Sequence, residues 1–175
     1  MILLMGIAGS GKGTQGALLA KEHGLHVIST GELLRNYGSP EQKQRMLTGE
    51  ILADEEVTAL LDKALSELPD KNAVILDGYP RRISQADWLL DQAKAGHFKL
   101  DKVLHLKVSR EAVKARLLDR GRQDDHNDAI EERFNEYERA TLPILEHLKE
   151  AGVQVIGING EQSVDNVHQT IMAVI

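Results

Sequence analysis

Cysteine is absent from the 175-residue sequence, proline occurs four times, and aromatic residues make up only 3%. Without cysteine the chain has no disulfide framework, no thiolate zinc site and no cysteine nucleophile, so we expect a cytoplasmic protein without zinc. Positive charge is scarce as well, because 21 Lys and Arg face 27 Asp and Glu for a net charge of −6. This balance argues against a general surface for nucleic acid or anionic membranes. An anionic substrate therefore needs a local cationic site.

The chain also lacks any apolar run near the roughly 20 residues that a membrane-spanning helix requires. Its hydrophobic content of 42% is that of an ordinary globular protein and excludes intrinsic disorder. Neither an internal repeat nor a low-complexity tract interrupts it. We therefore expect one domain, 1–175, with a sizeable core.

Short, nearly continuous apolar runs alternate along the chain with longer segments whose apolar residues recur every three or four positions. The runs indicate parallel strands covered on both faces, over 2–5, 26–29, 73–77, 102–108 and 153–158. The longer segments indicate helices over 14–23, 54–68, 84–94, 110–119 and 129–149. This order predicts an α/β fold, a doubly wound parallel sheet of five strands with helices on both faces. Ligands of such sheets bind beyond the carboxyl ends of the strands.

The strongest motif, GIAGSGKGTQ (6–15), directly follows the first predicted strand. A strand, a glycine-rich turn and a lysine at the start of a helix form a P-loop, whose backbone N–H groups and helix dipole bind phosphate. Lys12 would reach the β- and γ-phosphates. The next residue, usually Ser or Thr, is Gly13 here, and the hydroxyl follows at Thr14. A flexible turn with an exposed lysine is the plain alternative, and a P-loop alone indicates only a nucleoside triphosphate.

Four segments together resemble the adenylate kinase branch of the nucleoside monophosphate kinases. Besides GKGTQ they are STGELLR (29–35), LDGYPR (76–81) and RLLDRGRQDD (116–125), which Arg133 follows. Their order fits the family over the whole of 1–175, which implies a P-loop NTPase fold. The resemblance places a small excursion that binds the nucleoside monophosphate at about 30–53 and a short lid at about 120–126. The core then comprises 1–29, 54–119 and 127–175.

Within this resemblance each motif has a role in phosphoryl transfer between ATP and AMP. The implied catalytic residues are Lys12, Arg81, Arg120, Arg122 and Arg133. The implied ATP site comprises Gly9, Ser10, Gly11, Lys12, Gly13, Thr14, Arg116, Arg120 and Gln162. The implied AMP site comprises Thr30, Gly31, Arg35, Glu50, Ile51, Leu52, Gly78, Tyr79, Pro80, Arg81, Gln85, Arg122 and Arg133. Asp77 is implied to hold the water shell of Mg²⁺.

The acceptor residues also have plain structural explanations. Thr30 would cap the helix that it begins, and Arg35, just over one turn later, could be a solvated side chain. Asp77 ends an apolar strand, where a carboxylate is costly unless a cation or hydrogen bonds meet it. The resemblance implies that Gln85 reads adenine, with its C=O accepting from N6 and its NH₂ donating to N1. A polar residue in the first turn of a helix is the plain alternative. UMP/CMP kinases typically carry Ala and Asn in place of Thr30 and Gln85, so the sequence favours AMP.

Six of the ten arginines lie between Arg110 and Arg139. Arg116 and Arg120 are four residues apart on one helix face, where like charges repel unless an anion lies nearby. Guanidinium forks suit the charge of a transferring phosphoryl group. A solvated, salt-bridged face is the alternative, because acidic residues lie nearby: Asp119, Asp124, Asp125 and Glu132. We expect Asp124 and Asp125 to orient the arginines.

The predicted lid is very short, since only Gly121 separates Arg120 from Arg122. We therefore expect no zinc-binding lid. The reaction we expect is reversible, Mg²⁺-dependent transfer of the γ-phosphoryl group from ATP to AMP, giving two ADP, by a monomer without nucleic-acid or membrane partners. A UMP/CMP kinase or another small-acceptor P-loop kinase is the nearest alternative. A non-catalytic ATP-binding switch is more distant, because a switch needs no second phosphate site.

Overall fold

A computed structural model describes residues 1–47, 54–123 and 125–175 of the chain. Within these residues the strands are β1 (Ile2–Met5), β2 (His26–Ser29), β3 (Val74–Asp77), β4 (Lys102–Lys107) and β5 (Gln154–Asn159). They form one parallel sheet of five strands in the order β2-β3-β1-β4-β5. The predicted α/β fold is confirmed, and the strand bounds differ from the predicted ones only at their ends.

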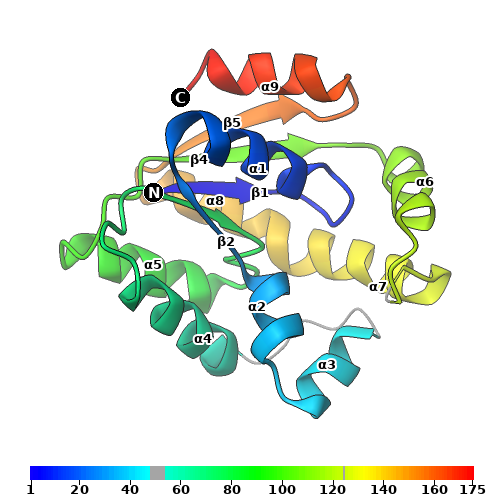
Figure 1. Cartoon of the computed structure of the whole chain (residues 1–175), viewed down its shortest axis with the longest axis horizontal. Coiled ribbons are helices and arrows are strands. Elements are labelled where there is room, and N and C mark those ends of the chain that lie inside the picture. The colour runs from blue at the N-terminus through cyan, green and yellow to red at the C-terminus, as the bar shows by residue number, and fades with distance from the viewer. Residues whose placement is uncertain (48–53, 124) are drawn as a thin grey trace.

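Helices cover both faces of this sheet, as predicted. In the described part of the chain they are α1 (Lys12–His23), α2 (Thr30–Tyr37), α3 (Pro40–Leu47), α4 (Asp54–Ser66), α5 (Ile83–Lys94), α6 (Arg110–Arg120), α7 (Asn127–Glu136), α8 (Leu142–Glu150) and α9 (Val164–Met172). Figure 1 shows α1 and α9 over one face, with α4, α5 and α8 on the other. None of the helices in the described ranges is long and apolar enough to cross a membrane.

The continuous apolar strands follow from this double cover. Successive residues of a strand point to opposite faces, so both Leu3 and Leu4 are fully buried, at 0% exposure. Leu3 belongs to the core cluster that contains Leu89 of α5, and Leu4 belongs to the cluster that contains Leu19 of α1. Because β1 runs directly into the P-loop, burial on both faces anchors the start of that loop.

The segment predicted as a helix over 129–149 is helical throughout, but it is not one regular α-helix. Between α7 and α8 lies a π-helical turn, η1 (Tyr137–Thr141), in which the N–H of Leu142 donates to the C=O of Tyr137. Pro143 follows at once. Proline has no N–H, and in a regular α-helix its ring would clash with the carbonyl one turn earlier. The regular hydrogen-bonding pattern therefore changes here, and Pro143 lies in the first turn of α8.

The segment predicted to form the acceptor excursion, about 30–53, contains α2 and α3 in its described part, and both lie to one side of the sheet in Figure 1. Its role in binding the acceptor stays a prediction. A reciprocal cap begins α3, because the Gln42 N–H donates to Ser39 Oγ (3.2 Å) and the Ser39 N–H donates to Gln42 Oε1 (2.8 Å). The Nε2 of His126, at the start of α7, lies 3.0 Å from the carbonyl oxygen of Leu47. This contact joins the end of α3 to the beginning of α7.

Candidate active site

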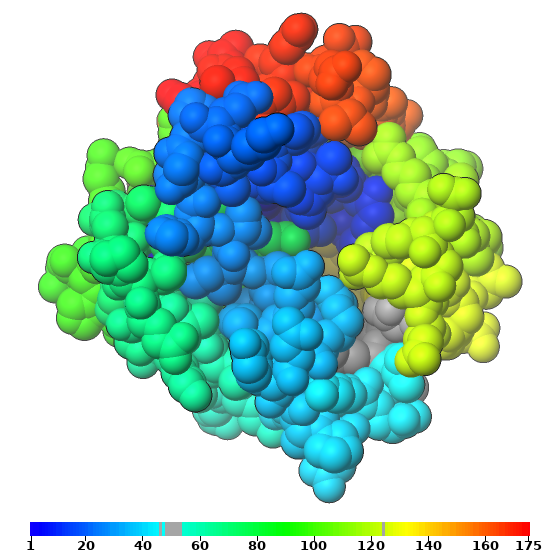
Figure 2. Space-filling view, viewed as in Figure 1, coloured from blue at the N-terminus to red at the C-terminus, as the bar shows by residue number. Residues whose placement is uncertain are grey.

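A cavity of about 860 Å³ lies at the carboxyl ends of the strands. Figure 2 shows the hollow between α1 and the segment around α6 and α7. The predicted site residues that line it are Gly9, Ser10, Gly11, Lys12, Gly13, Thr14, Gly31, Arg35, Asp77, Gly78, Tyr79, Pro80, Arg81, Arg116, Arg120, Arg122, Arg133 and Gln162. Thr30 and Gln85 are buried and do not belong to this lining. Glu50, Ile51, Leu52 and Asp124 lie outside the described residues.

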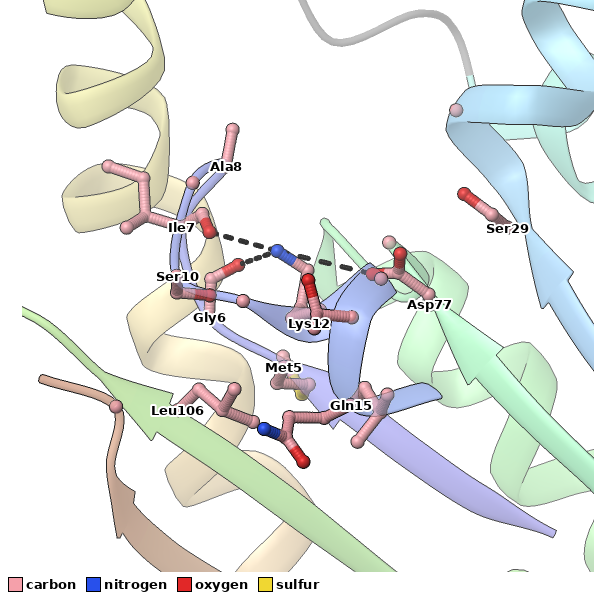
Figure 3. Close-up of a pocket in the computed structure, with 18 of the residues that line it drawn as sticks. Met5, Gly6, Ile7, Ala8, Ser10, Lys12, Gln15, Ser29, Asp77 and Leu106 are labelled. Carbon is pink, nitrogen blue, oxygen red and sulfur yellow. Dashed lines mark hydrogen bonds and ion pairs between the residues drawn. The ribbon is translucent and has the colours of Figure 1, made fainter. Parts of the chain in front are cut away.

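The P-loop connects β1 to α1 and turns its backbone toward the cavity. Gly11 caps α1 with a φ of 100°, in the left-handed region that a side chain would disfavour. The N-terminus of α1 therefore opens into the cavity, where its unpaired N–H groups and dipole attract anions. Figure 3 shows Lys12 folded back over the loop, with Nζ donating to the carbonyl oxygens of Gly6 (2.7 Å) and Ile7 (2.9 Å).

The Lys12 ammonium is held in a nearly water-free position. Burial lowers its pKa to about 8, and the positive charges of Arg81, Arg120 and Arg133 act in the same direction. Asp77 opposes them, with Oδ1 4.0 Å from Nζ. A phosphate would stabilise the charged form, so this position favours an anionic ligand.

The turn after β3 joins the acceptor excursion to the core. Arg81 Nε donates to the carbonyl oxygen of Gly78 (2.9 Å), and Thr30 Oγ1 donates to the same oxygen (2.8 Å). Gly78 has a φ of +81°, and a Cβ there would lie 2.9 Å from Thr30 Oγ1. Thr30 was expected to cap α2, but Ser29 occupies the cap position. The Thr30 hydroxyl instead fastens α2 to this turn.

Arg81 and Arg35 bring positive charge to the same wall. The guanidinium of Arg35 folds over Gly31, where an added Cβ would lie 3.5 Å from both of its Nη atoms. Burial lowers the pKa of Arg81, Asp77 raises it, and the charges of Arg133 and Arg35 lower it further. Like charges gathered on a half-buried wall are stabilised by an anion between them.

Asp125 organises a further group of cations beside the P-loop. Its fully buried carboxylate accepts two hydrogen bonds from Arg120 (2.7 and 2.8 Å), one from Arg133 Nη1 (3.0 Å) and one from the N–H of Arg122 (3.2 Å). Burial alone would raise the pKa of Asp125, but these hydrogen bonds outweigh it and hold the pKa below its usual value. The carboxylate thereby links Arg120, the last residue of α6, to Arg133 in the last turn of α7.

The opposite end of the cavity lies near the loop after β5. Arg116 Nη2 donates to the carbonyl oxygen of Gly160 (2.9 Å), which ties α6 to this loop. Gln162 and Val164 line the cavity next to it. Two predicted residues, Arg116 and Gln162, therefore lie on one wall with the P-loop.

Gln85 is 2% exposed and its amide makes two protein contacts. Oε1 accepts from the N–H of Arg81 (2.7 Å), and Nε2 donates to Asp54 Oδ1 (3.0 Å). Gln85 thus lies directly behind the turn that carries Arg81. Its role in reading adenine stays a prediction.

Several lining residues were missed by the sequence reasoning, namely Glu32, Glu136, Tyr137 and Thr141. Glu136 is buried, and its Oε2 has no hydrogen-bond partner among the described residues. Glu136 and Tyr137 follow Arg133 by three and four residues, the spacing of one helix face, so the sequence did contain this signal. Tyr137 OH is hydrogen-bonded to the buried His105, whose pKa falls to about 4 because of burial and of the cations Lys107 and Lys12.

A phosphate cradle that faces arginines from three other segments across one cavity is built to move a phosphoryl group, so fold and site define a P-loop phosphotransferase. A family model described as "Adenylate kinase" matches residues 4–153. The adenylate kinase of Corynebacterium aurimucosum is 35% identical over 95% of this chain and 94% of its own length. That of Leptospira biflexa is 35% identical over 98% and 97%, and that of Mycobacterium sp. (strain MCS) is 37% identical over 85% of both chains. The chain belongs to the adenylate kinase family.

Proposed function

We propose that the protein transfers the γ-phosphoryl group of ATP to AMP, reversibly and with Mg²⁺, to give two molecules of ADP. One observation carries the proposal: two cationic groups line a single cavity. Lys12 represents the P-loop side, and Arg35 and Arg81 represent the side formed by α2 and the turn after β3. A protein that binds one nucleotide needs one phosphate site, whereas transfer between two nucleotides needs two sites in line.

On the donor side, the backbone N–H groups of residues 9–14 and the start of α1 would hold the phosphates of ATP, together with Lys12. Arg116 and Gln162 would border the adenosine. On the acceptor side, Arg35 and Arg81 would bind the phosphate of AMP. The proposed AMP pocket further includes Thr30, Gly31, Gly78, Tyr79, Pro80, Gln85 and residues 50–52.

The transferred group would meet Arg120, Arg122 and Arg133. Its negative charge spreads over equatorial oxygens, and guanidinium groups that are already fixed stabilise it without reorganising. Asp125 supplies this fixation for Arg120 and Arg133 through its hydrogen bonds. No general base is required, because the attacking oxygen of AMP is already anionic. Catalysis then consists of positioning and electrostatic stabilisation.

The residues around Asp77 fit a Mg²⁺ ion held through water. No group of three His, Asp or Glu side chains able to cage a metal occurs in residues 1–47, 54–123 and 125–175. Asp77 Oδ1 is nevertheless a buried oxygen without a hydrogen-bond partner there, at the end of β3 beside Lys12. Mg²⁺ keeps several waters and takes one or two carboxylates together with phosphate oxygens. Bound with ATP, it would neutralise phosphate charge during the transfer.

AMP is favoured over other acceptors by Thr30 and Gln85, whose counterparts in UMP/CMP kinases are typically Ala and Asn. None of the relatives named above is a UMP/CMP kinase. The second group of arginines also speaks against an ATP-binding switch. One chain supplies both phosphate sites, so a monomer suffices; the monomeric state and the cytoplasmic location stay predictions.

A dinucleotide of two adenosines joined by five phosphates tests the proposal, because it can occupy both sites only when they lie in line. We expect calorimetric binding much tighter than that of ATP alone, and weaker binding after Arg35→Ala. If the dinucleotide binds no more tightly than ATP, the proposal of a second nucleotide site in line with the first is contradicted. An acceptor panel of AMP, UMP, CMP and GMP at fixed Mg-ATP then measures specificity, and a preference for UMP or CMP would favour the alternative kinase.

A further inference from the structure

A polar contact joins the first residue of α4 to the first turn of α5. The carboxylate of Asp54, where the chain returns from the acceptor excursion, accepts a hydrogen bond from Gln85 Nε2 (3.0 Å) and one from Ser84 Oγ. Arg82 Nε lies 3.5 Å from Asp54 Oδ1. We propose that Asp54 is a specificity-determining residue, which fixes the orientation of the Gln85 amide and so selects 6-aminopurine over 6-oxopurine acceptors. The inference rests on the proposed function, in which Gln85 faces the acceptor base.

The orientation of the amide follows from its two neighbours. The N–H of Arg81 can only donate, and it lies 2.7 Å from Gln85 Oε1. The carboxylate of Asp54 can only accept, and it lies 3.0 Å from Nε2. A flipped amide would set two donors against each other at Arg81 and two acceptors against each other at Asp54. Both neighbours therefore favour the same orientation.

Each end of the amide keeps half of its hydrogen-bonding capacity. Oε1 has a second lone pair and Nε2 a second N–H. An acceptor next to a donor matches the N6 amino group and N1 of adenine. Hypoxanthine and guanine present O6 and N1–H in the reverse order, so they would require the flipped amide. Rejection of a mismatched base is strong when buried polar groups are left unpaired.

Asp54 is itself held in place, which a reliable orienting group requires. Both of its oxygens accept hydrogen bonds, one from Ser84 and one from Gln85. Gln85 is almost fully buried, so water cannot readily replace a lost partner. A carboxylate that merely clamped α4 to α5 would affect every acceptor equally. Only an orienting carboxylate changes the ratio between two acceptors.

The test compares kcat/KM for AMP with that for inosine 5′-monophosphate at saturating Mg-ATP. The variant Asp54→Asn keeps the size of the side chain but can present either a donor or an acceptor to Gln85. We expect the AMP preference to fall by about tenfold, the effect of roughly one hydrogen bond, with the KM for ATP unchanged. Ser84→Ala is the comparison variant, because it removes one partner of Asp54 but keeps the carboxylate and its contact with Gln85. It should lower the AMP preference less than Asp54→Asn does.

An AMP preference within twofold of the wild-type value in Asp54→Asn overturns the inference. If Asp54→Asn does not fold, Asp54→Ser replaces it. Serine, like aspartate, is favoured at the start of a helix, and like asparagine it carries no charge. Gln85→Ala separates the two levels of the proposal. If Gln85→Ala loses the AMP preference but both Asp54 variants keep it, the role of Asp54 is refuted and that of Gln85 is not. A wild-type protein without AMP preference, unaffected by Gln85→Ala, refutes the proposed acceptor site.

Discussion

Replacing Asp125 by asparagine should weaken both the fold and the catalytic step. The carboxylate is fully buried and is the common partner of Arg120, Arg133 and the N–H of Arg122. Removing one member of a buried ion pair typically costs about 3–5 kcal/mol, because the remaining charge is left without compensation. Arg120 is still 33% exposed and can regain water, so we expect a loss of about 2–3 kcal/mol in the free energy of unfolding.

The catalytic effect of Asp125→Asn follows from position. Without the negative charge, Arg120 and Arg133 repel each other and lose the geometry in which they meet the transferred group. A displacement of about 1 Å can cost up to about a hundredfold in rate, so we expect kcat to fall between tenfold and a hundredfold. ADP formation coupled to a dehydrogenase measures kcat, and urea unfolding followed by circular dichroism measures stability.

Asp119→Asn is the matched control for Asp125→Asn. Asp119 precedes Arg120 on α6 and carries the same charge, but its side chain is exposed. We expect its kcat to stay within twofold of the wild-type value. An unchanged kcat in Asp125→Asn would refute the reasoning, because the arginines would then keep their geometry without the carboxylate.

Other predictions concern the P-loop and the turn after β3. Lys12→Ala should lower kcat by about 10²–10³-fold in the same assay, and a loss below tenfold would remove Lys12 from the site. Because the pKa of Lys12 is about 8, kcat/KM for ATP should fall as the pH rises through about 8, whereas kcat should fall only at higher pH, since bound phosphate stabilises the ammonium. Between about pH 8 and pH 10.5, the ordinary pKa of lysine, Lys12 is protonated in the unfolded chain but has lost its proton in the folded protein. As the pH rises through that interval, the free energy of unfolding of the wild-type protein should therefore increase relative to that of Lys12→Met. Urea titrations in which this difference falls with pH would contradict the burial of the ammonium. Gly78→Ala should cost about 1–2 kcal/mol of unfolding free energy and raise the KM for AMP more than that for ATP, because of the positive φ and the nearby Thr30 hydroxyl. Equal changes in the two KM values would separate this turn from the acceptor site.

Local patterns were sufficient to predict the fold. The strands are apolar because the sheet is covered on both faces, and the motif at 6–15 specifies a turn that few other structures require. The same patterns placed Lys12 and Asp77 at one edge of the sheet, where the carboxyl ends of parallel strands lie, and both line the cavity. Arg133 of α7 lines it too, but it was assigned to the site through the family resemblance.

Contacts between distant segments could not be predicted in this way. Threonine is a residue type that often caps helices, but the hydroxyl of Thr30 donates to the carbonyl oxygen of Gly78, 48 residues away in the chain. Gln85 was interpreted through its amide alone, and its partner Asp54 lies 31 residues away. Competition between a local and a distant partner is decided by packing, which sequence periodicity does not encode.

The tether between Asp125 and the arginines also affects the entropy of substrate capture. A free arginine side chain loses up to about 2 kcal/mol of rotamer entropy when a ligand immobilises it. Arg120 and Arg133 are restrained by one carboxylate before any nucleotide arrives. These two side chains lose their rotamer entropy when the protein folds, not when a nucleotide binds. Most of the attraction between their guanidinium groups and phosphate therefore contributes to binding.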